Sequence, residues 1–254
     1  MESLRIGCVK YLNARPLISG WPGKVVFDHP AALCAQLARN DLDVALVSSF
    51  EFLRNPIYRI VDGVSISSNG AVYSVVVAHC GDIADLEEIE LDPAAETSGN
   101  LLRCLLAQLR LSARVAARST SSITEKRARL LIGDQAIRFR QEHAGEFNFW
   151  DLGEQWKNLV GLPFVYALWL VRPEIRDPKS IADRLRKLRD ANLCDLGELI
   201  SKEKDIEQGF CDRYYREHLR FSFGEKEKEG LHTFQALCQK HGLLPKCDVA
   251  FSVV

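Results

Sequence analysis

The chain has 254 residues, of which 47% are hydrophobic, enough apolar material for one large domain or two smaller lobes. Its 33 basic and 34 acidic residues leave a formal net charge of -1, so no overall field would draw it to nucleic acid or an anionic membrane. The N-terminus lacks a signal-peptide pattern, and no stretch reaches the ~20 apolar residues that cross a bilayer. We therefore expect a cytoplasmic protein with no nucleic-acid or membrane partner.

The eight cysteines and six histidines are scattered along the chain. No two cysteines form a C-x-x-C pair, and the histidines have no H-E-x-x-H or similar spacing. Widely separated cysteines inside apolar runs are typical of buried, reduced thiols. The sequence therefore predicts neither a disulfide framework nor a metal site.

Short apolar runs alternate with a helical pattern in the first fifty residues. Strands are predicted at 4–8, 24–27 and 43–47, and a helix is predicted over 30–39. Ser48 is predicted to cap the helix that follows the third strand, with Glu51 as its capping-box partner. This order is typical of βαβ units with parallel strands.

Two extended segments, 60–67 and 71–79, come next, and the alternation then restarts. The restarted unit is predicted to contain a strand at 89–91, a leucine-rich helix around 101–109 and a strand at 129–132. Residues 164–171 are again extended and apolar, and the chain beyond them has only helical patterns. Two crossings around an inserted unit indicate two hinged lobes, which we expect at 1–78 with 170–254 (lobe 1) and 79–169 (lobe 2).

Polar residues occur where predicted strands give way to helices, the position at which open α/β sheets bind ligands. These corners are Lys10 to Asn13, Ser48-Ser49, Thr97-Ser98 and Gly133-Asp134. Pro16 follows the first corner at a first-turn position whose N–H would be unpaired in any case. Free backbone donors at such helix starts suit an anion or a polar ligand, although each corner is also explained as a simple cap.

Several motifs are more specific than these corners. They are Tyr11-Leu12-Asn13 with Pro16-Leu17, Leu131 to Asp134, Asp151-Leu152-Gly153, Trp156, and the run from Gly161 to Trp169. Together they closely resemble the chorismate dehydratases of the futalosine route to menaquinone, from the first strand to at least Trp169. The resemblance implies an α/β fold of the two-lobed type II periplasmic-binding-protein class with a central ligand cleft, in agreement with the alternation of elements.

The resemblance also implies an activity. Chorismate dehydratases are carbon–oxygen hydro-lyases that remove water from chorismate to give 3-[(1-carboxyvinyl)oxy]benzoate, without a metal or organic cofactor. Losing the ring hydroxyl and a ring proton makes the ring aromatic, so the protein mainly has to position and desolvate the substrate and assist proton movement. The two substrate carboxylates suit a cleft in which helix N-termini face one another.

The site residues follow from the resemblance and from the strand-end corners. Asn13 and Ser74 are the expected catalytic residues, with Asn13 holding the departing hydroxyl or the ring carboxylate. The expected substrate-binding residues are Lys10, Ser48, Ser49, Thr97, Ser98 and Gly133. Arg15 is a second cation near the first corner, and Asp134 is expected to cap the following helix.

One residue departs from the family pattern. Relatives commonly have Ser-Arg-Thr-Ser where this chain has Ala95-Glu96-Thr97-Ser98, so an anion replaces a cation. We expect Glu96 to face solvent. No histidine lies in a matched motif, which suggests the hypothesis that a substrate carboxylate removes the ring proton. An aromatic set is expected to pack in the core rather than to wall the substrate: Trp150, Trp156, Phe164, Tyr166 and Trp169.

Two alternative functions stay open. The first is 1,4-dihydroxy-6-naphthoate synthase of the same pathway, whose corresponding stretch usually reads Leu-Pro-Leu-Pro-Leu-Gly. The run from Leu162 to Ala167 reads Leu-Pro-Phe-Val-Tyr-Ala here, which disfavours that enzyme. The second is a non-catalytic cytoplasmic binding protein for a small aromatic carboxylic acid.

Overall fold

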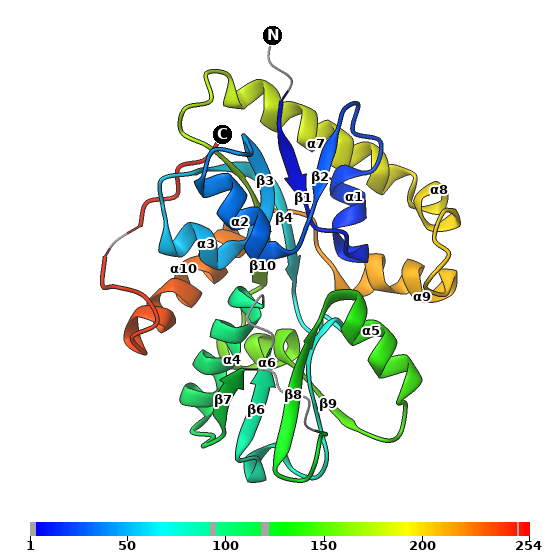
Figure 1. The fold of residues 1–254 in the computed structure, drawn as a ribbon, viewed down its shortest axis with the longest axis vertical. Coiled ribbons are helices and arrows are strands. Elements are labelled where there is room, and N and C mark those ends of the chain that lie inside the picture. Colours follow the sequence, from blue (N-terminus) through cyan, green and yellow to red (C-terminus); the bar gives the residue numbers. More distant parts are fainter. Residues whose placement is uncertain (1–3, 92–94, 118–121, 248) are drawn as a thin grey trace.

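The computed structural model describes residues 4–91, 95–117, 122–247 and 249–254. Figure 1 shows two α/β lobes, one above the other, with both ends of the chain at the upper lobe. Each lobe is built around one five-stranded sheet. None of the helices within the described ranges is long and apolar enough to cross a membrane.

The first sheet has the strand order β2-β1-β3-β10-β4. Its strands are β1 (Ile6–Cys8), β2 (Val25–Phe27), β3 (Val44–Ser48), β4 (Arg59–Ser68) and β10 (Phe164–Val171). The first three pair in parallel, and β10 lies antiparallel between β3 and β4. The predicted parallel unit at the start of the chain is therefore confirmed.

The second sheet repeats this plan with the order β7-β6-β8-β5-β9. Its strands are β5 (Val75–His79), β6 (Glu88–Leu91), β7 (Arg114–Ala117), β8 (Arg127–Ile132) and β9 (Asn148–Asp151). Strands β6, β7 and β8 are parallel, whereas β5 runs antiparallel to β8 and β9. In each sheet, therefore, the fourth position is taken by a strand that enters from the other lobe.

These two entering strands locate the crossings between lobes. β5 belongs to the second sheet from Val75 onward, and β10 belongs to the first sheet from Phe164 onward. The expected boundaries at 78/79 and 169/170 would have cut through both strands. We therefore propose crossings at 69–74 and 161–163, a few residues earlier in each case.

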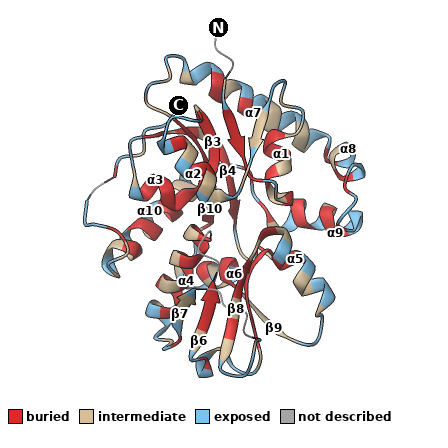
Figure 2. Ribbon diagram, in the orientation of Figure 1, coloured by how far each residue is buried: buried red, intermediate tan, exposed pale blue. Residues whose placement is uncertain are grey.

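Helices cover the sheets, and Figure 2 shows that the inner strands of both sheets are mostly buried. The first lobe carries η1 (Leu12–Ala14), α1 (Arg15–Ile18), α2 (Pro30–Ala38), α3 (Ser49–Arg54), α7 (Pro178–Cys194), α8 (Leu196–Ser201), α9 (Gln208–Arg213), the π-helical turn η3 (Tyr214–His218) and α10 (Glu225–Lys240). The second lobe carries η2 (Ile83–Asp85), α4 (Glu96–Leu109), α5 (Gly133–Glu142) and α6 (Leu152–Val160). The predicted strands β1, β3, β5 and β10 are buried almost throughout, because helices shield both of their faces. The predicted strand at 24–27 is β2, an edge strand that is partly exposed.

Candidate active site

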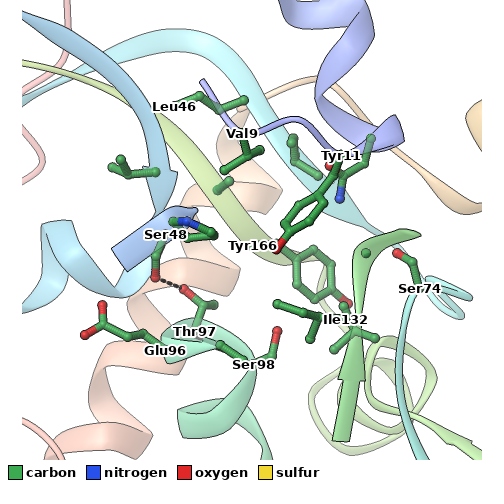
Figure 3. A pocket seen from close by; sticks show the side chains of 18 of the residues that line it. Val9, Tyr11, Leu46, Ser48, Ser74, Glu96, Thr97, Ser98, Ile132 and Tyr166 are labelled. Carbon is green, nitrogen blue, oxygen red and sulfur yellow. Dashed lines mark hydrogen bonds between the residues drawn. The ribbon is translucent and has the colours of Figure 1, made fainter. Parts of the chain in front are cut away.

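A pocket lies between the lobes where the carboxyl ends of both sheets meet. Figure 3 shows side chains from both lobes converging on it. Its polar lining includes most of the predicted site residues, namely Asn13, Ser48, Ser74, Thr97, Ser98 and Gly133. Its apolar walls include Val9, Leu46, Ile66, Val72 and Ile132. Parallel strands of both sheets end here, so residues far apart in the sequence share one cavity.

Hydroxyl groups join the two lobes at one end of the pocket. The Ser48 and Thr97 hydroxyls form a hydrogen bond, and Thr97 Oγ1 also accepts from the Phe50 backbone N–H at 3.1 Å. Thr97 therefore caps helix α3 from the opposite lobe. The predicted capping box of Ser48 with Glu51 is wrong, because Ser48 makes no side-chain cap and Glu51 pairs with Arg54 instead.

Ser49, predicted to bind substrate, lies behind this hydroxyl cluster. Its side chain is fully buried and its hydroxyl donates to the Val165 carbonyl at 2.7 Å. Its oxygen lies 3.4 Å from Thr97 Oγ1 and does not line the pocket. Ser49 thus ties helix α3 to strand β10 and supports the cluster from outside the cavity.

Ser74 sits at the end of the first crossing, on a strained turn. Tyr73, just before it, has a positive φ of 67°. The Ser74 N–H donates to the Val72 carbonyl at 2.8 Å, which closes a three-residue turn around Tyr73. Such a conformation is unfavourable for a side-chain-bearing residue and persists where its surroundings hold it. Here it places the buried Ser74 side chain at the pocket.

Asp151 holds this turn in place. Its buried carboxylate accepts hydrogen bonds from the Val72 and Tyr73 N–H groups at 3.0 and 2.7 Å. It also caps helix α6 by accepting from the N–H groups of Gly153 and Glu154 at 3.0 and 3.1 Å. Asp151 therefore fixes the first crossing to the start of α6.

Gly153 is the other member of this motif, and the packing requires its small size. A Cβ at this position would lie 2.5 Å from the Gly70 carbonyl oxygen and 2.7 Å from the Tyr166 hydroxyl. Since backbone cannot yield as a flexible side chain can, any larger residue would push the first crossing away from the start of α6. The Asp151-Leu152-Gly153 motif is thus explained by the geometry of the crossing.

Gly133 and Asp134 bring the second lobe against the first corner. Gly133 has a φ of +58°, and a Cβ there would lie 3.1 Å from the Tyr11 ring. The Asp134 carboxylate accepts from the Leu12 backbone N–H at 2.8 Å, in the opposite lobe. The expectation that Asp134 caps its own helix is therefore wrong, because the side chain reaches across the cleft to the N-terminus of η1. Burial raises the pKa of Asp134 despite this hydrogen bond.

Helices α4 and α5 both begin at the pocket. Neither has a side-chain cap from the described residues, and the residues of their first turns include Thr97, Ser98 and Gly133. Uncapped N-terminal N–H groups together with the helix dipole favour an anionic group. The Gly133 N–H at the start of α5 already donates to the Ser74 carbonyl at 2.8 Å, so the start of α4 is the better suited of the two to a carboxylate.

Lys10 and Arg15, the two cations near the first corner, lie outside the lining of the pocket. Lys10 is exposed and borders neighbouring surface hollows instead of the pocket. Lys10, predicted to bind substrate, does not line this pocket, because the extended chain turns Val9 inward and Lys10 outward. Arg15 forms an ion pair with the buried carboxylate of Glu203.

Glu96 lines the pocket, contrary to the expectation that it faces solvent. Its Oε1 accepts from Arg54 at 2.7 Å, across the lobes, and its Oε2 is buried without a partner among the described residues. Figure 3 shows the carboxylate turned away from the other labelled side chains of the pocket. The negative charge at this corner is therefore paired with Arg54 rather than presented to a ligand.

Potential ligand atoms for a metal also gather around Arg54. Side-chain atoms of Cys34, Glu51 and Glu96 lie within 4.8 Å of one another. Arg54, however, forms ion pairs with both carboxylates. Burial, followed by the charges of Glu51 and Glu96, raises the pKa of the Cys34 thiol to about 12, so it stays protonated at neutral pH. The cluster thus balances its charge with a guanidinium and is poorly suited to a cation.

Aromatic residues contribute more to the pocket than expected. Trp156, Phe164 and Trp169 pack in the core as predicted, whereas Tyr166 lines the pocket. Tyr11, known from its motif but given no role, also lines it. An alternating pattern cannot distinguish these positions, because a pocket wall and a core contact need the same buried ring.

The histidines lie outside this pocket. His29 borders a neighbouring hollow, and His79 is buried on β5 in the second sheet. Within the described part of the chain, no histidine lines the pocket. The usual general base is therefore not provided by a histidine of these residues.

Comparisons with known proteins agree with this geometry. The family described as menaquinone biosynthesis matches residues 4–240. A chorismate dehydratase of Thermus thermophilus is 28% identical over 92% of this chain and 94% of its own, and one of Campylobacter jejuni is 24% identical over 90% and 91%.

Solved structures show the same fold. A protein from Archaeoglobus fulgidus superposes with a TM-score of 0.74 at 17% identity, over 95% of this chain and 98% of its own. The periplasmic aliphatic sulphonate binding protein of Escherichia coli superposes with a TM-score of 0.66 at 14% identity, over 97% and 89%. The predicted two-lobed periplasmic-binding-protein fold is thereby confirmed, and the chain belongs to the menaquinone biosynthesis family.

Proposed function

We propose that this chain is a chorismate dehydratase, a hydro-lyase that converts chorismate to 3-[(1-carboxyvinyl)oxy]benzoate. The observation that carries the proposal is the similarity to two chorismate dehydratases over at least nine-tenths of each chain. The pocket supports it, because Asn13 and Ser74 lie with Thr97 and Ser98 in one cavity between the lobes.

The reaction needs no change of oxidation state. A ring C–H bond breaks, its electron pair forms the new ring double bond, and hydroxide leaves from the neighbouring carbon. The hydroxide and the released proton make one water molecule. Because the product ring is aromatic, the protein has to hold the substrate, exclude water and assist the departure of hydroxide.

The substrate carboxylates match the helix N-termini that face the pocket. One carboxylate would lie at the N-terminus of α4, where Thr97 and Ser98 add hydroxyl donors. Asn13 and Ser74 would then face the reacting part of the ring. This arrangement would bind a dianion without a cationic side chain from the described lining of the pocket, which agrees with the outward position of Lys10.

We further propose that a substrate carboxylate removes the ring proton. The proposal rests on the absence of histidine from the described lining and on the pairing of Glu96 with Arg54. Asn13→Ala is expected to abolish turnover, while His29→Ala, His79→Ala and Glu96→Gln retain it in steady-state assays. Loss of turnover in one of these three variants, with the fold intact, would assign the base to that residue and end the substrate-base proposal.

The cellular setting is also a proposal. We place the enzyme in the futalosine route, since its relatives are named chorismate dehydratases within a menaquinone biosynthesis family. A cytoplasmic location is supported by the eight cysteines, all of which are unpaired. Oxidising compartments favour disulfides in proteins with many cysteines.

Mass spectrometry after incubation of the purified protein with chorismate tests the function. The expected product has the mass of chorismate minus one water. Chorismate recovered unchanged but bound to the protein would indicate the binding-protein alternative. Turnover of a later, cyclised pathway intermediate, with chorismate untouched, would indicate the naphthoate synthase.

A further inference from the structure

A buried tyrosine outside every motif of the sequence hydrogen-bonds one of the two expected catalytic side chains. Tyr214, on the π-helical turn η3, is wholly buried, and its hydroxyl donates to Ser74 Oγ at 2.6 Å. Short π-helical segments are frequent at functional sites, because the wider turn re-aims side chains.

The direction of this hydrogen bond follows from the number of protons. A tyrosine hydroxyl has one proton, which Tyr214 gives to Ser74. Burial raises the pKa of Tyr214, so the hydroxyl keeps its proton at neutral pH.

The Ser74 side chain is thereby given a fixed role. It accepts from Tyr214, so its own proton is left to donate to a ligand. Asn13 lines the same pocket, and its Oδ1 is buried without a partner among the described residues. This end of the pocket therefore presents a hydroxyl donor of fixed direction.

We propose that Tyr214 is a positioning residue that sets Ser74 as a hydrogen-bond donor to the departing hydroxyl of the substrate. The inference rests on the proposed dehydratase function. The Ser74 proton then lies where negative charge develops as the C–O bond breaks.

Tyr214→Phe tests this directly, because it removes one oxygen and leaves the ring. Without that hydroxyl, the Ser74 side chain is free to rotate away from the position that it holds in the pocket. We expect kcat to fall about 100-fold, the scale of misplacing a reacting group by about 1 Å, with KM changed less than threefold. A uniform loss of binding would instead raise KM and leave kcat unchanged.

Tyr215→Phe is the matched control. Tyr215 is the next residue on the same turn, is also buried, and donates to the Leu12 carbonyl at 2.9 Å rather than to a pocket side chain. The Tyr215→Phe variant loses a buried phenol hydroxyl just as Tyr214→Phe does, so its unfolding free energy should fall by a similar amount while its kcat stays within threefold of the wild-type value. Equal kcat losses in the two variants would overturn the proposal.

A double-mutant cycle separates positioning from general damage. If Tyr214 acts through Ser74, Tyr214→Phe should lower kcat far less in a Ser74→Ala background than in the wild type. Full additivity of the two losses would overturn the proposal. Wild-type protein inactive on chorismate would sink the dehydratase function, whereas active wild type with an unimpaired Tyr214→Phe variant would sink this inference alone.

Discussion

Replacing Asp151 with asparagine removes one of the two acceptor atoms on which the first crossing depends. Oδ1 accepts from the backbone N–H groups of Val72, Gly153 and Glu154, and Oδ2 accepts from that of Tyr73, at 2.7 to 3.1 Å. The amide keeps most of these hydrogen bonds with its oxygen at the Oδ1 position, which leaves the Tyr73 N–H facing the amide N–H₂ without an acceptor. A buried unsatisfied donor costs about 1–3 kcal/mol, so we expect Asp151→Asn to lose about 2 kcal/mol of unfolding free energy.

Urea unfolding followed by circular dichroism measures this loss, with equal m-values required for the comparison. Asp177→Asn is the matched control, because Asp177 caps α7 by accepting from a single N–H, that of Ser180 at 3.1 Å. Asparagine caps helices as well as aspartate does, so this variant should lie within about 0.5 kcal/mol of wild type. A loss below about 1 kcal/mol for Asp151→Asn would refute the role given to its four hydrogen bonds.

Three further predictions address the cleft and its surroundings. Gly133→Ala places a Cβ against the Tyr11 ring at a positive φ, so it should lower the unfolding free energy by about 1–2 kcal/mol and raise KM. An unchanged melting temperature and KM would show that the close contact of Gly133 with Tyr11 is unimportant. Thr97→Val removes the hydroxyl that accepts from the Phe50 N–H and should lower the unfolding free energy by about 1 kcal/mol. Unfolding indistinguishable from that of the wild type would show that this cap between the lobes is unimportant. Burial holds the pKa of His79 below 6.5, so the unfolded chain binds more protons than the folded one and stability falls as the pH drops below that value. His79→Leu should flatten this decline in urea unfolding measured at several pH values, and an equally steep decline would show that another group titrates.

The sequence was most informative where burial was complete. Strand β10 was predicted at its observed bounds because eight consecutive residues are almost all apolar and lie between two strands. Strands β7 and β9 were missed, since both lie at sheet edges and most of their residues are partly exposed. An edge strand needs no apolar run, and so leaves no periodic signal.

The residues of the site also divide into those that could be predicted from the sequence and those that could not. The strand-end argument and the family resemblance together located Asn13, Ser74 and Thr97, which share one pocket. The partners of these residues could not be predicted, because they come from distant parts of the chain. Local rules assigned Ser48 to its own helix although its partner lies in the other lobe, and nothing in the helical C-terminal third singled out Tyr214.

The position of bound chorismate tests the central claim most directly. A crystal structure of the Asn13→Ala protein, soaked with chorismate to trap unreacted substrate, would reveal where it binds. We predict the ring between the lobes, with one carboxylate at the start of α4 near Thr97 and the ring hydroxyl beside Ser74. Chorismate bound outside this pocket, with the pocket itself vacant at saturating substrate, would contradict the account.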